Sequence, residues 1–367
     1  MARELVAIES PSGDVAALDR CATRLIDALE KAGGAVTRPR HDAATAAHVQ
    51  ADWPGNGSRV LVLGHFDTVY PVGQLRRQPI EIRDGRLFGP GTYDMKTGLA
   101  MAICAIQAVV SVTPVDRRPT ITLLATADEE VGSASSRAFI EDLARESAAV
   151  LVLEPALASG AVKTARKGVG EFEIAVTGVP AHAGVDPSAG ASAIHELARL
   201  VGVLRALADP SRGLTVNVGT IEGGTRPNVI AEHARARVDV RIARMEDAER
   251  IQQAIAELRA EDSRARVVVS GGINRPPMER TAGVVRLFEL ARAVAKEQGW
   301  NLEEGMTGGG SDGNFTAALG VPTLDGLGAV GDGAHALHEH VVIKDLVPRA
   351  ALVAGLLERL GDNGWRS

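Results

Sequence analysis

The sequence has few cysteines, few aromatic residues and no excess of positive charge. Its two cysteines, Cys21 and Cys104, exclude a disulfide framework and a cysteine-based metal site, and we expect both to be buried, reduced thiols. Aromatic residues make up 3% of the chain and hydrophobic residues 45%, so the core must be aliphatic and rich in alanine. The net charge of −6 argues against a nucleic-acid partner.

Long apolar runs are also missing. None approaches the roughly 20 residues that a membrane-spanning helix needs, and the segment MARELVAIESPSG lacks the charged-then-apolar pattern of a signal peptide. We therefore expect a cytoplasmic protein with no membrane partner. A length of 367 residues is typical of two domains rather than one.

Short apolar strands alternate with helices in the first and last parts of the chain. This alternation predicts an α/β fold with a mostly parallel sheet covered by helices on both faces. Strands are expected at 60–63, 121–127 and 150–156, with a short one near VPTLDGL. Helices are expected at 17–32, 95–110, 135–147, 283–299 and 344–360.

The middle of the chain, residues 169–278, has a different pattern. EFEIAVTG at 171–178 alternates apolar and polar residues, and the elements that follow give the order β-α-β-β-α-β. This is the split βαβ, ferredoxin-like arrangement, with an open sheet and helices on one face. We predict that it is inserted into a larger domain made of residues 1–168 and 279–367. The alternative is two consecutive domains, with the last part of the chain as a separate unit.

Acidic residues and histidines gather where the expected strands end, which is the edge where open α/β sheets bind ligands. Several carboxylates at one edge repel one another, and a divalent cation removes that repulsion. A mixed imidazole–carboxylate set is typical of zinc or a similar metal. The candidates in chain order are His65, Asp67, Asp94, Asp128, Glu129, Glu130, Glu154, His335, His338 and His340.

Each candidate also has an ordinary explanation. Asp94 would cap a helix that starts at residue 95. Glu129 and Glu130 would favour a helix dipole, and His65 would be a hydrogen-bonded structural histidine. Glu154 is harder to explain, because a carboxylate directly after the apolar VLVL is largely buried and needs a partner. One metal centre explains all of these residues together.

A glycine pattern near the C-terminus resembles a nucleotide-binding motif. GLGAVG at 326–331 matches G-x-G-x-x-G, but that motif must open a helix. Here DGAHALHEHV follows and has no helical apolar pattern. We therefore expect no nucleotide site.

Eight segments together resemble the two-zinc peptidases, which include glutamate carboxypeptidases (carboxypeptidase G), aminoacylases and acyl-amino-acid deacylases. The resemblance covers nearly the whole chain and is closest to the carboxypeptidase G branch, chiefly through HFDTVY and TGGGSD. The segments in chain order are GHFDTVY, GPGTYDMKTG, TADEEVGS, LVLEPA, AHAG, NVGTIEGGTRPNVI, TGGGSDGNF and GAH.

The resemblance implies two zinc ions, with cobalt or manganese as alternatives. Asp94 would bridge the two ions. His65 and Glu154 would complete one site, and Glu130 and His335 would complete the other. His335 is chosen over the two later histidines because it follows Gly-Ala.

The resemblance also implies roles beyond metal binding. Asp67 would orient the ring of His65, and Glu129 would be the general base. His182, in the inserted domain, would reach the active site of a partner subunit and stabilise the oxyanion. The inserted domain would act as a lid and carry the contact of a homodimer. One departure is Thr97, where the family usually has glycine.

Substrate binding rests on residues that recognise a free carboxylate, which arginine binds bidentately. Arg241 and Arg275 are candidates, with Asn228; either arginine would otherwise form a surface or inter-strand ion pair. Gly309 and Gly310 would let backbone amides approach the substrate, or would belong to a flexible loop.

We therefore expect a metallo-carboxypeptidase that hydrolyses an amide bond and releases a C-terminal amino acid, glutamate, from a small acyl or peptidyl conjugate. The alternative is a deacylase of N-acyl amino acids. A non-catalytic metal-binding relative is disfavoured, because Glu129 is needed for proton transfer and not for metal binding.

Overall fold

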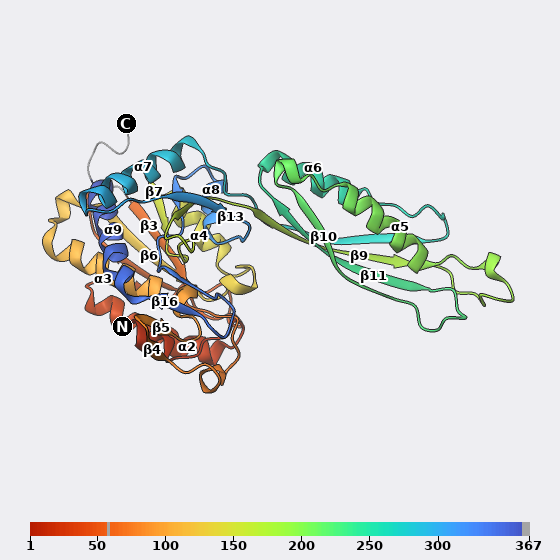
Figure 1. Cartoon of the computed structure of the whole chain (residues 1–367), viewed down its shortest axis with the longest axis horizontal. Coiled ribbons are helices and arrows are strands. Elements are labelled where there is room, and N and C mark those ends of the chain that lie inside the picture. Colours follow the sequence, from red (N-terminus) through yellow and green to blue (C-terminus); the bar gives the residue numbers. More distant parts are fainter. Residues whose placement is uncertain (57–58, 362–367) are drawn as a thin grey trace. The chain divides into compact units, whose positions relative to one another are not determined.

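The computed structural model describes residues 1–56 and 59–361, which form two compact units (Figure 1). The larger unit contains Met1–Ala165, Arg280–Thr307 and the described residues from Ser311 onward. The smaller unit contains Arg166–Glu279 together with Gly308–Gly310. The glycine-rich segment is therefore divided between the two units.

A six-stranded sheet forms the centre of the larger unit. Its strands, in spatial order, are β1 (Ala35–Thr37), β2 (Val49–Trp53), β6 (Thr120–Thr126), β3 (Arg59–His65), β7 (Ala149–Val152) and β14 (Thr323–Leu324). The last four are parallel to one another, whereas β1 and β2 pair in the antiparallel sense. The predicted mostly parallel sheet is confirmed, and β1 and β2 had no counterpart among the predicted strands.

Helices cover both faces of this sheet. They are α2 (Val15–Lys31), α3 (Thr97–Val112), α4 (Arg137–Arg145), α7 (Ala282–Glu297), α8 (Gly313–Ala318) and α9 (Ile343–Gly361). On β3, Val60 and Val62 belong to a core cluster with α2, α3, α7 and α9, whereas Leu61 and Leu63 belong to a cluster with α4 and α8. Because successive strand residues point to opposite faces, each strand must be apolar on both.

Short elements complete the larger unit. One small sheet has the order β15-β16-β5-β4, and another pairs β13 with β8. Their bounds are β4 Glu81–Arg83, β5 Arg86–Phe88, β8 Val162–Arg166, β13 Glu304–Thr307, β15 Gly331–Asp332 and β16 His340–Val342, and helix α1 is Ala2–Val6.

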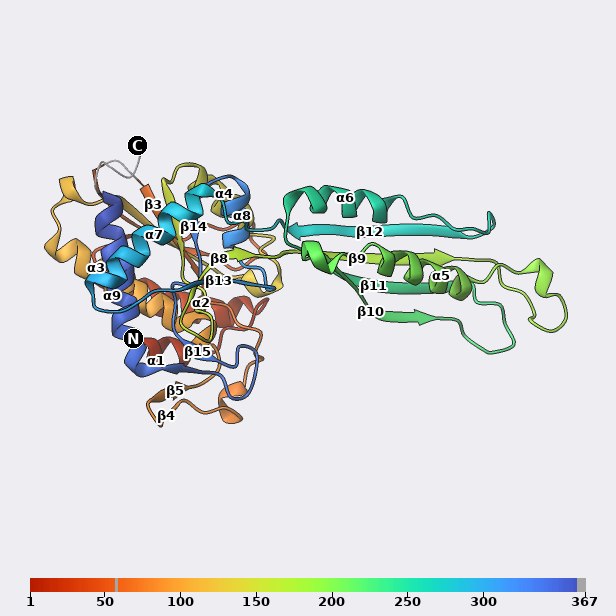
Figure 2. The same cartoon turned by 45° about the horizontal axis from the view of Figure 1, so that its top comes forward.

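The smaller unit has the predicted order β-α-β-β-α-β. Its elements are β9 (Gly168–Thr177), α5 (Ala193–Ala206), β10 (Thr215–Gly223), β11 (His233–Ile242), α6 (Met245–Ala256) and β12 (Arg266–Arg275). The antiparallel sheet has the order β10-β11-β9-β12, with both helices along one face (Figure 2). Phe172, Ile174 and Val176, the alternating apolar residues of β9, are buried in a core cluster with α5 and α6.

One stretch, Thr92–Val112, is long and apolar enough to span a membrane, contrary to the expectation that no run approaches that length. However, 67% of its most apolar window is buried inside the structure. The backbone at Asp94 and Met95 is not helical, so the continuous helix is α3 alone, with 16 residues. A buried core helix passes the same test of length and composition.

The two cysteines differ in their surroundings. Both are free, and Cys21 is buried as expected. The expectation is wrong for Cys104, which is exposed on α3 together with Gln107 and Ala108.

Candidate metal centre

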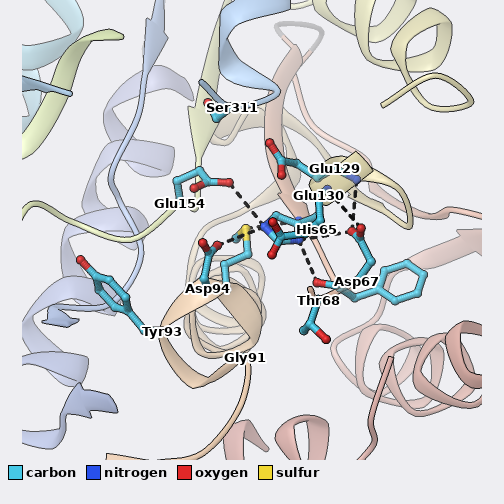
Figure 3. A network of polar contacts seen from close by, with 12 residues as sticks. His65, Asp67, Thr68, Gly91, Tyr93, Asp94, Glu129, Glu130, Glu154 and Ser311 are labelled. Atoms are coloured by element: carbon cyan, nitrogen blue, oxygen red, sulfur yellow. Dashed lines mark hydrogen bonds and ion pairs between the residues drawn. The ribbon is translucent and has the colours of Figure 1, made fainter. Parts of the chain in front are cut away.

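The carboxyl ends of three neighbouring parallel strands lie at one edge of the central sheet. β3 ends at His65, β6 at Thr126 and β7 at Val152, and β3 lies between the other two. Figure 3 shows the acidic side chains that follow these ends gathered around His65. They are Asp67, Glu129, Glu130 and Glu154, together with Asp94 from the turn before α3.

Five side chains form two groups that share Asp94. One group is His65, Asp94 and Glu154, the other is Asp94, Glu130 and His335, and the ligand atoms of each lie within 4.8 Å of one another. His65 Nε2 lies 3.2 Å from Asp94 Oδ1 and 3.5 Å from Glu154 Oε1. His335 Nε2 lies 3.5 Å from Asp94 Oδ2 and 3.2 Å from Glu130 Oε2. Asp94 thus presents one oxygen to each group, as a bridging carboxylate does.

Asp67 lies behind His65 and is fully buried. Its carbonyl oxygen is 3.1 Å and its Oδ1 is 3.3 Å from His65 Nδ1, which leaves Nε2 facing the other carboxylates. Ser12 donates its hydroxyl to Asp67 Oδ2 at 2.6 Å. The backbone N–H groups of Glu129 and Glu130 donate to Oδ1 and Oδ2, each at 3.2 Å. Asp67 therefore orients the His65 ring and fixes the turn that carries both glutamates.

Protonated histidines balance the carboxylates in this arrangement. Burial acts to lower the pKa of His65, but hydrogen bonds to Asp67 and to the two carboxylates of its group raise it well above its usual value. Hydrogen bonds to Asp94 and to the second carboxylate of its group raise the pKa of His335 to about 10. Buried carboxylates that need positive charge beside them are the electrostatic setting of a cation site.

Both groups fit a pair of divalent cations. Each offers an imidazole nitrogen and carboxylate oxygens, the donor set of zinc and related ions. Glu130 Oε1 is buried and has no hydrogen-bond partner among the described residues, whereas buried polar atoms are normally paired. A cation next to this oxygen would satisfy it.

The ordinary explanations do not account for the acidic residues. The N-cap of α3 is Lys96, so Asp94 does not cap that helix. Glu129 and Glu130 lie in a separate 3-10 turn, several residues before α4 begins at Arg137.

Thr97, which departs from the family pattern, begins α3 and is buried with an ordinary φ of −69°. In the part of the chain that the structure describes, its hydroxyl oxygen has no hydrogen-bond partner. The following residue must be glycine, because a Cβ on Gly98 would lie 2.4 Å from the carbonyl oxygen of Leu153. The backbone therefore requires Gly98 and accommodates Thr97.

Of the three late histidines, the structure brings His335 to a metal group. His340 is buried against the ring of Phe88, and its Nδ1 lies 2.9 Å from the carbonyl oxygen of His338. The side chain of His338 is exposed.

Two residues near the groups have no counterpart in the sequence predictions. Ser12 holds Asp67, and Glu339 is a fully buried carboxylate that accepts hydrogen bonds from the turn carrying Asp94. The signal that pointed to Glu154 is absent for Glu339, since the adjoining strand β16 has only three residues and begins with His340.

The profile of peptidase family M20/M25/M40 matches residues 61–359. This chain belongs to that family. It is therefore a metallopeptidase, a hydrolase of peptide or amide bonds. All five residues of the two groups lie within the matched range.

Two curated relatives and one solved structure of another protein are similar to this M20 peptidase over most of its length. It is 31% identical to carboxypeptidase G2 from Pseudomonas sp. (strain RS-16), over 98% of this chain and 88% of the relative. It is 28% identical to a succinyl-diaminopimelate desuccinylase from Delftia acidovorans, over 93% of this chain and 92% of the relative. Aminopeptidase PepT from Bacillus cereus shares the fold with a TM-score of 0.80 at 23% identity, covering 98% of this chain and 97% of that one.

In the smaller unit of the M20 peptidase, His182 lies on an exposed turn after β9. Its Nδ1 accepts hydrogen bonds from the backbone N–H groups of Gly184 and Val185, both at 3.1 Å. The proton of a neutral ring is therefore on Nε2, which makes that atom a hydrogen-bond donor. The carbonyl of Asn228 holds the same turn by accepting the N–H of Ala183 at 3.0 Å.

Arg241 forms an ion pair within its own strand. Its guanidinium donates to both carboxylate oxygens of Asp239, at 2.9 to 3.2 Å. This is the ordinary explanation that the sequence also offered for Arg241.

Arg275 lies beside the glycine-rich segment. It is buried, its Nη1 donates to Asn274 at 2.9 Å, and a Cβ on Gly310 would lie 2.8 Å from its Cδ. A second buried arginine, Arg166, donates to the carbonyls of Gly309 and Gly310 at 3.2 and 3.1 Å. Arg166 was not among the predicted residues. Its hydrogen bonds hold Gly309 and Gly310, for which a flexible loop was the alternative expectation.

The GLGAVG segment does not open a helix; it lies between β14 and β15. A Cβ on Gly328 would lie 2.2 Å from the carbonyl oxygen of Leu153. The carbonyls of Gly326 and Gly328 accept hydrogen bonds from the buried guanidinium of Arg349 in α9. Close packing and this arginine explain the glycines.

Proposed function

We propose that the two groups bind two zinc ions bridged by Asp94, with cobalt or manganese as alternatives. The enzyme then hydrolyses an amide bond and releases a C-terminal amino acid, glutamate, from a small acyl or peptidyl conjugate. One observation carries this proposal: two carboxylate–imidazole groups share Asp94, and Glu129, from the same turn as Glu130, belongs to neither group. The likeness to carboxypeptidase G2 supports the choice of bond.

Bound divalent ions would polarise a carbonyl and lower the pKa of a coordinated water from about 15.7 toward about 7. Glu129 takes the proton of the attacking water and passes it to the departing amine, the work of a general base and then a general acid. Asp67 supports this step because it accepts the N–H of Glu129 and so holds the backbone of the turn that carries that side chain.

We propose that the smaller unit is the lid and dimerisation domain of a homodimer. His182 would then act in the active site of the partner subunit, where its Nε2–H donates to the oxygen that becomes negative. Arg275, with Asn228 and the backbone amides of Gly309 and Gly310, would hold the free carboxylate of the substrate. We place the enzyme in the cytoplasm.

A second candidate function is deacylation of N-acyl amino acids, favoured by the 28% identity to a succinyl-diaminopimelate desuccinylase. The two functions share the metal centre and differ in which side of the amide the enzyme recognises. The proposed carboxypeptidase would tolerate changes in the acyl group and require glutamate, whereas a deacylase would require its acyl group.

The test is a panel of substrates given to the zinc-loaded enzyme. N-Benzoyl-glutamate and folate-type conjugates vary the acyl side, and N-benzoyl and N-succinyl derivatives of other amino acids vary the leaving side. Release of free glutamate with several acyl groups supports the carboxypeptidase. Turnover only of N-succinyl compounds, whatever the amino acid, would replace it with the deacylase.

A further inference from the structure

Glu339 is a fully buried carboxylate that neither metal group uses. Its Oε1 accepts the backbone N–H groups of Tyr93 at 2.8 Å and Asp94 at 3.0 Å. Its Oε2 accepts the N–H of Gly91 at 3.0 Å and the hydroxyl of Tyr70 at 2.7 Å. Four donors therefore converge on one carboxylate directly behind the turn that carries Asp94.

The donors and Glu339 belong to segments that carry residues of the metal groups. Asp94 is itself one of the donors, and Glu339 follows His335 by four positions. The Tyr70 hydroxyl also lies 3.1 Å from the carbonyl oxygen of Ala336, next to His335. Glu339 thus connects the loop of His335 to the turn of Asp94.

The remaining group residues are held in other ways. His65 is the last residue of β3, in the middle of the sheet. The carbonyl of Glu154 accepts the N–H of Gly328 at 2.9 Å, and the N–H of Glu130 donates to Asp67. In the group with Glu154, Glu339 contacts the backbone of Asp94 alone. In the group with Glu130, it contacts the backbone of Asp94 and, through Tyr70, the backbone next to His335.

We propose that Glu339 is a positioning residue that sets Asp94 and His335 in place for the cation held with Glu130. The inference rests on the proposed function, because it assumes that both groups bind ions. An amide at position 339 would turn an –NH2 group toward N–H and O–H donors, so Asp94 and His335 would lose their fixed positions.

The experiment titrates metal-free enzyme with zinc against a chromophoric chelator, and with cobalt by visible absorption. For Glu339→Gln, we expect one ion to bind as in the wild type and the second about 10- to 100-fold more weakly, the usual effect of losing a residue that orients a ligand. The cobalt spectrum should accordingly lose the absorption of one site.

Glu196→Gln is the matched control. Glu196 lies in the smaller unit, is largely buried and accepts the backbone N–H groups of Glu261 and Asp262 at 3.0 and 3.1 Å, so the chemistry of the change is the same. Unlike Glu339, Glu196 also pairs with Arg199, so the change removes an ion pair as well. It should lower the thermal stability and leave both zinc affinities unchanged.

The outcomes separate the two proposals. A wild type that binds fewer than two ions overturns the proposed metal centre. A wild type that binds two ions, with a folded Glu339→Gln that binds both equally well, overturns the positioning role alone. If Glu339→Gln does not fold, Tyr70→Phe removes one of the four donors and is measured in the same way; unchanged affinity for the second ion then overturns the inference.

Discussion

Asp67→Asn is the most informative single change in the larger unit, because one buried side chain supports both a candidate metal group and the turn of the proposed general base. The substitution keeps the shape and replaces one carboxylate oxygen with an –NH2 group. In the wild type, Oδ1 faces His65 Nδ1 and the N–H of Glu129, and Oδ2 faces the Ser12 hydroxyl and the N–H of Glu130. Whichever oxygen the –NH2 group replaces, it therefore faces hydrogen-bond donors rather than acceptors.

The expected magnitude follows from these four contacts. With –NH2 in place of Oδ2, the Ser12 hydroxyl can rotate and accept, and only the N–H of Glu130 is left opposed. With –NH2 in place of Oδ1, His65 would have to give up its Nδ1 proton, and the neutral ring would keep its proton on Nε2, the atom that faces the metal group. The first placement is cheaper, and losing one hydrogen bond to a charged group costs about 1.5–3 kcal/mol of unfolding free energy. The neutral amide also orients His65 less firmly, so zinc should bind roughly 10- to 100-fold more weakly.

Urea unfolding of the metal-free protein, followed by tryptophan fluorescence, measures the first effect, since Trp53 is buried in β2 of the larger unit. Chelator competition measures the second. Asp247→Asn is the control, because Asp247 is equally buried in the smaller unit and pairs with Arg212 and Arg250. If Asp67→Asn unfolded at the wild-type urea concentration and bound zinc with wild-type affinity, the supporting role of Asp67 would be refuted.

Three further predictions follow from the same geometry. Glu129→Gln should keep both metal ions while kcat falls by about 100- to 10,000-fold; metal analysis and steady-state kinetics check this, and wild-type turnover would remove Glu129 as the base. In the proposed homodimer, His182→Ala should fold and assemble as the wild type does, with kcat lowered roughly 100- to 1,000-fold; sedimentation and kinetics test it, and unchanged kcat contradicts the proposed role. The pKa of His335 is raised to about 10 and that of His65 also lies well above its usual value, so both are protonated near neutral pH and must lose a proton to bind zinc. Zinc affinity should therefore rise with pH, with protons released on binding. Calorimetry in buffers of different ionisation enthalpy measures this release, and zinc binding without proton release would disprove the proposed proton balance.

The strands predicted from the sequence are those with unbroken apolar runs. β3, β6 and β7 are buried on both faces, so their sequences carry a continuous signal. β2 reads VQADW, and its burial alternates, because it lies near an edge of the sheet and contains Gln50 and Asp52. β4, β5, β15 and β16 have two or three residues each, too few to form a period. Their pairing depends on contacts between distant segments.

The same distinction applies to the site. Residues at strand ends could be proposed together, because parallel strands bring their carboxyl ends to one edge. Glu339 could not be proposed from the sequence, because its four donors lie 245 to 269 positions away along the chain. Arg241 was proposed for substrate binding because its chemistry fits a carboxylate, and only the structure revealed Asp239 beside it.

The charges around the groups favour two ions rather than one. Five carboxylates are largely buried in or directly behind the groups: Asp67, Asp94, Glu130, Glu154 and Glu339. Among the described residues, one buried lysine, Lys96, lies near them and donates to the carbonyl of Ile8 at 2.6 Å. Two divalent cations bring these formal charges to neutrality, whereas one ion leaves two negative charges uncompensated. Uncompensated buried charge is costly, so filling one group alone would require protons to remain on the histidines or carboxylates of the other.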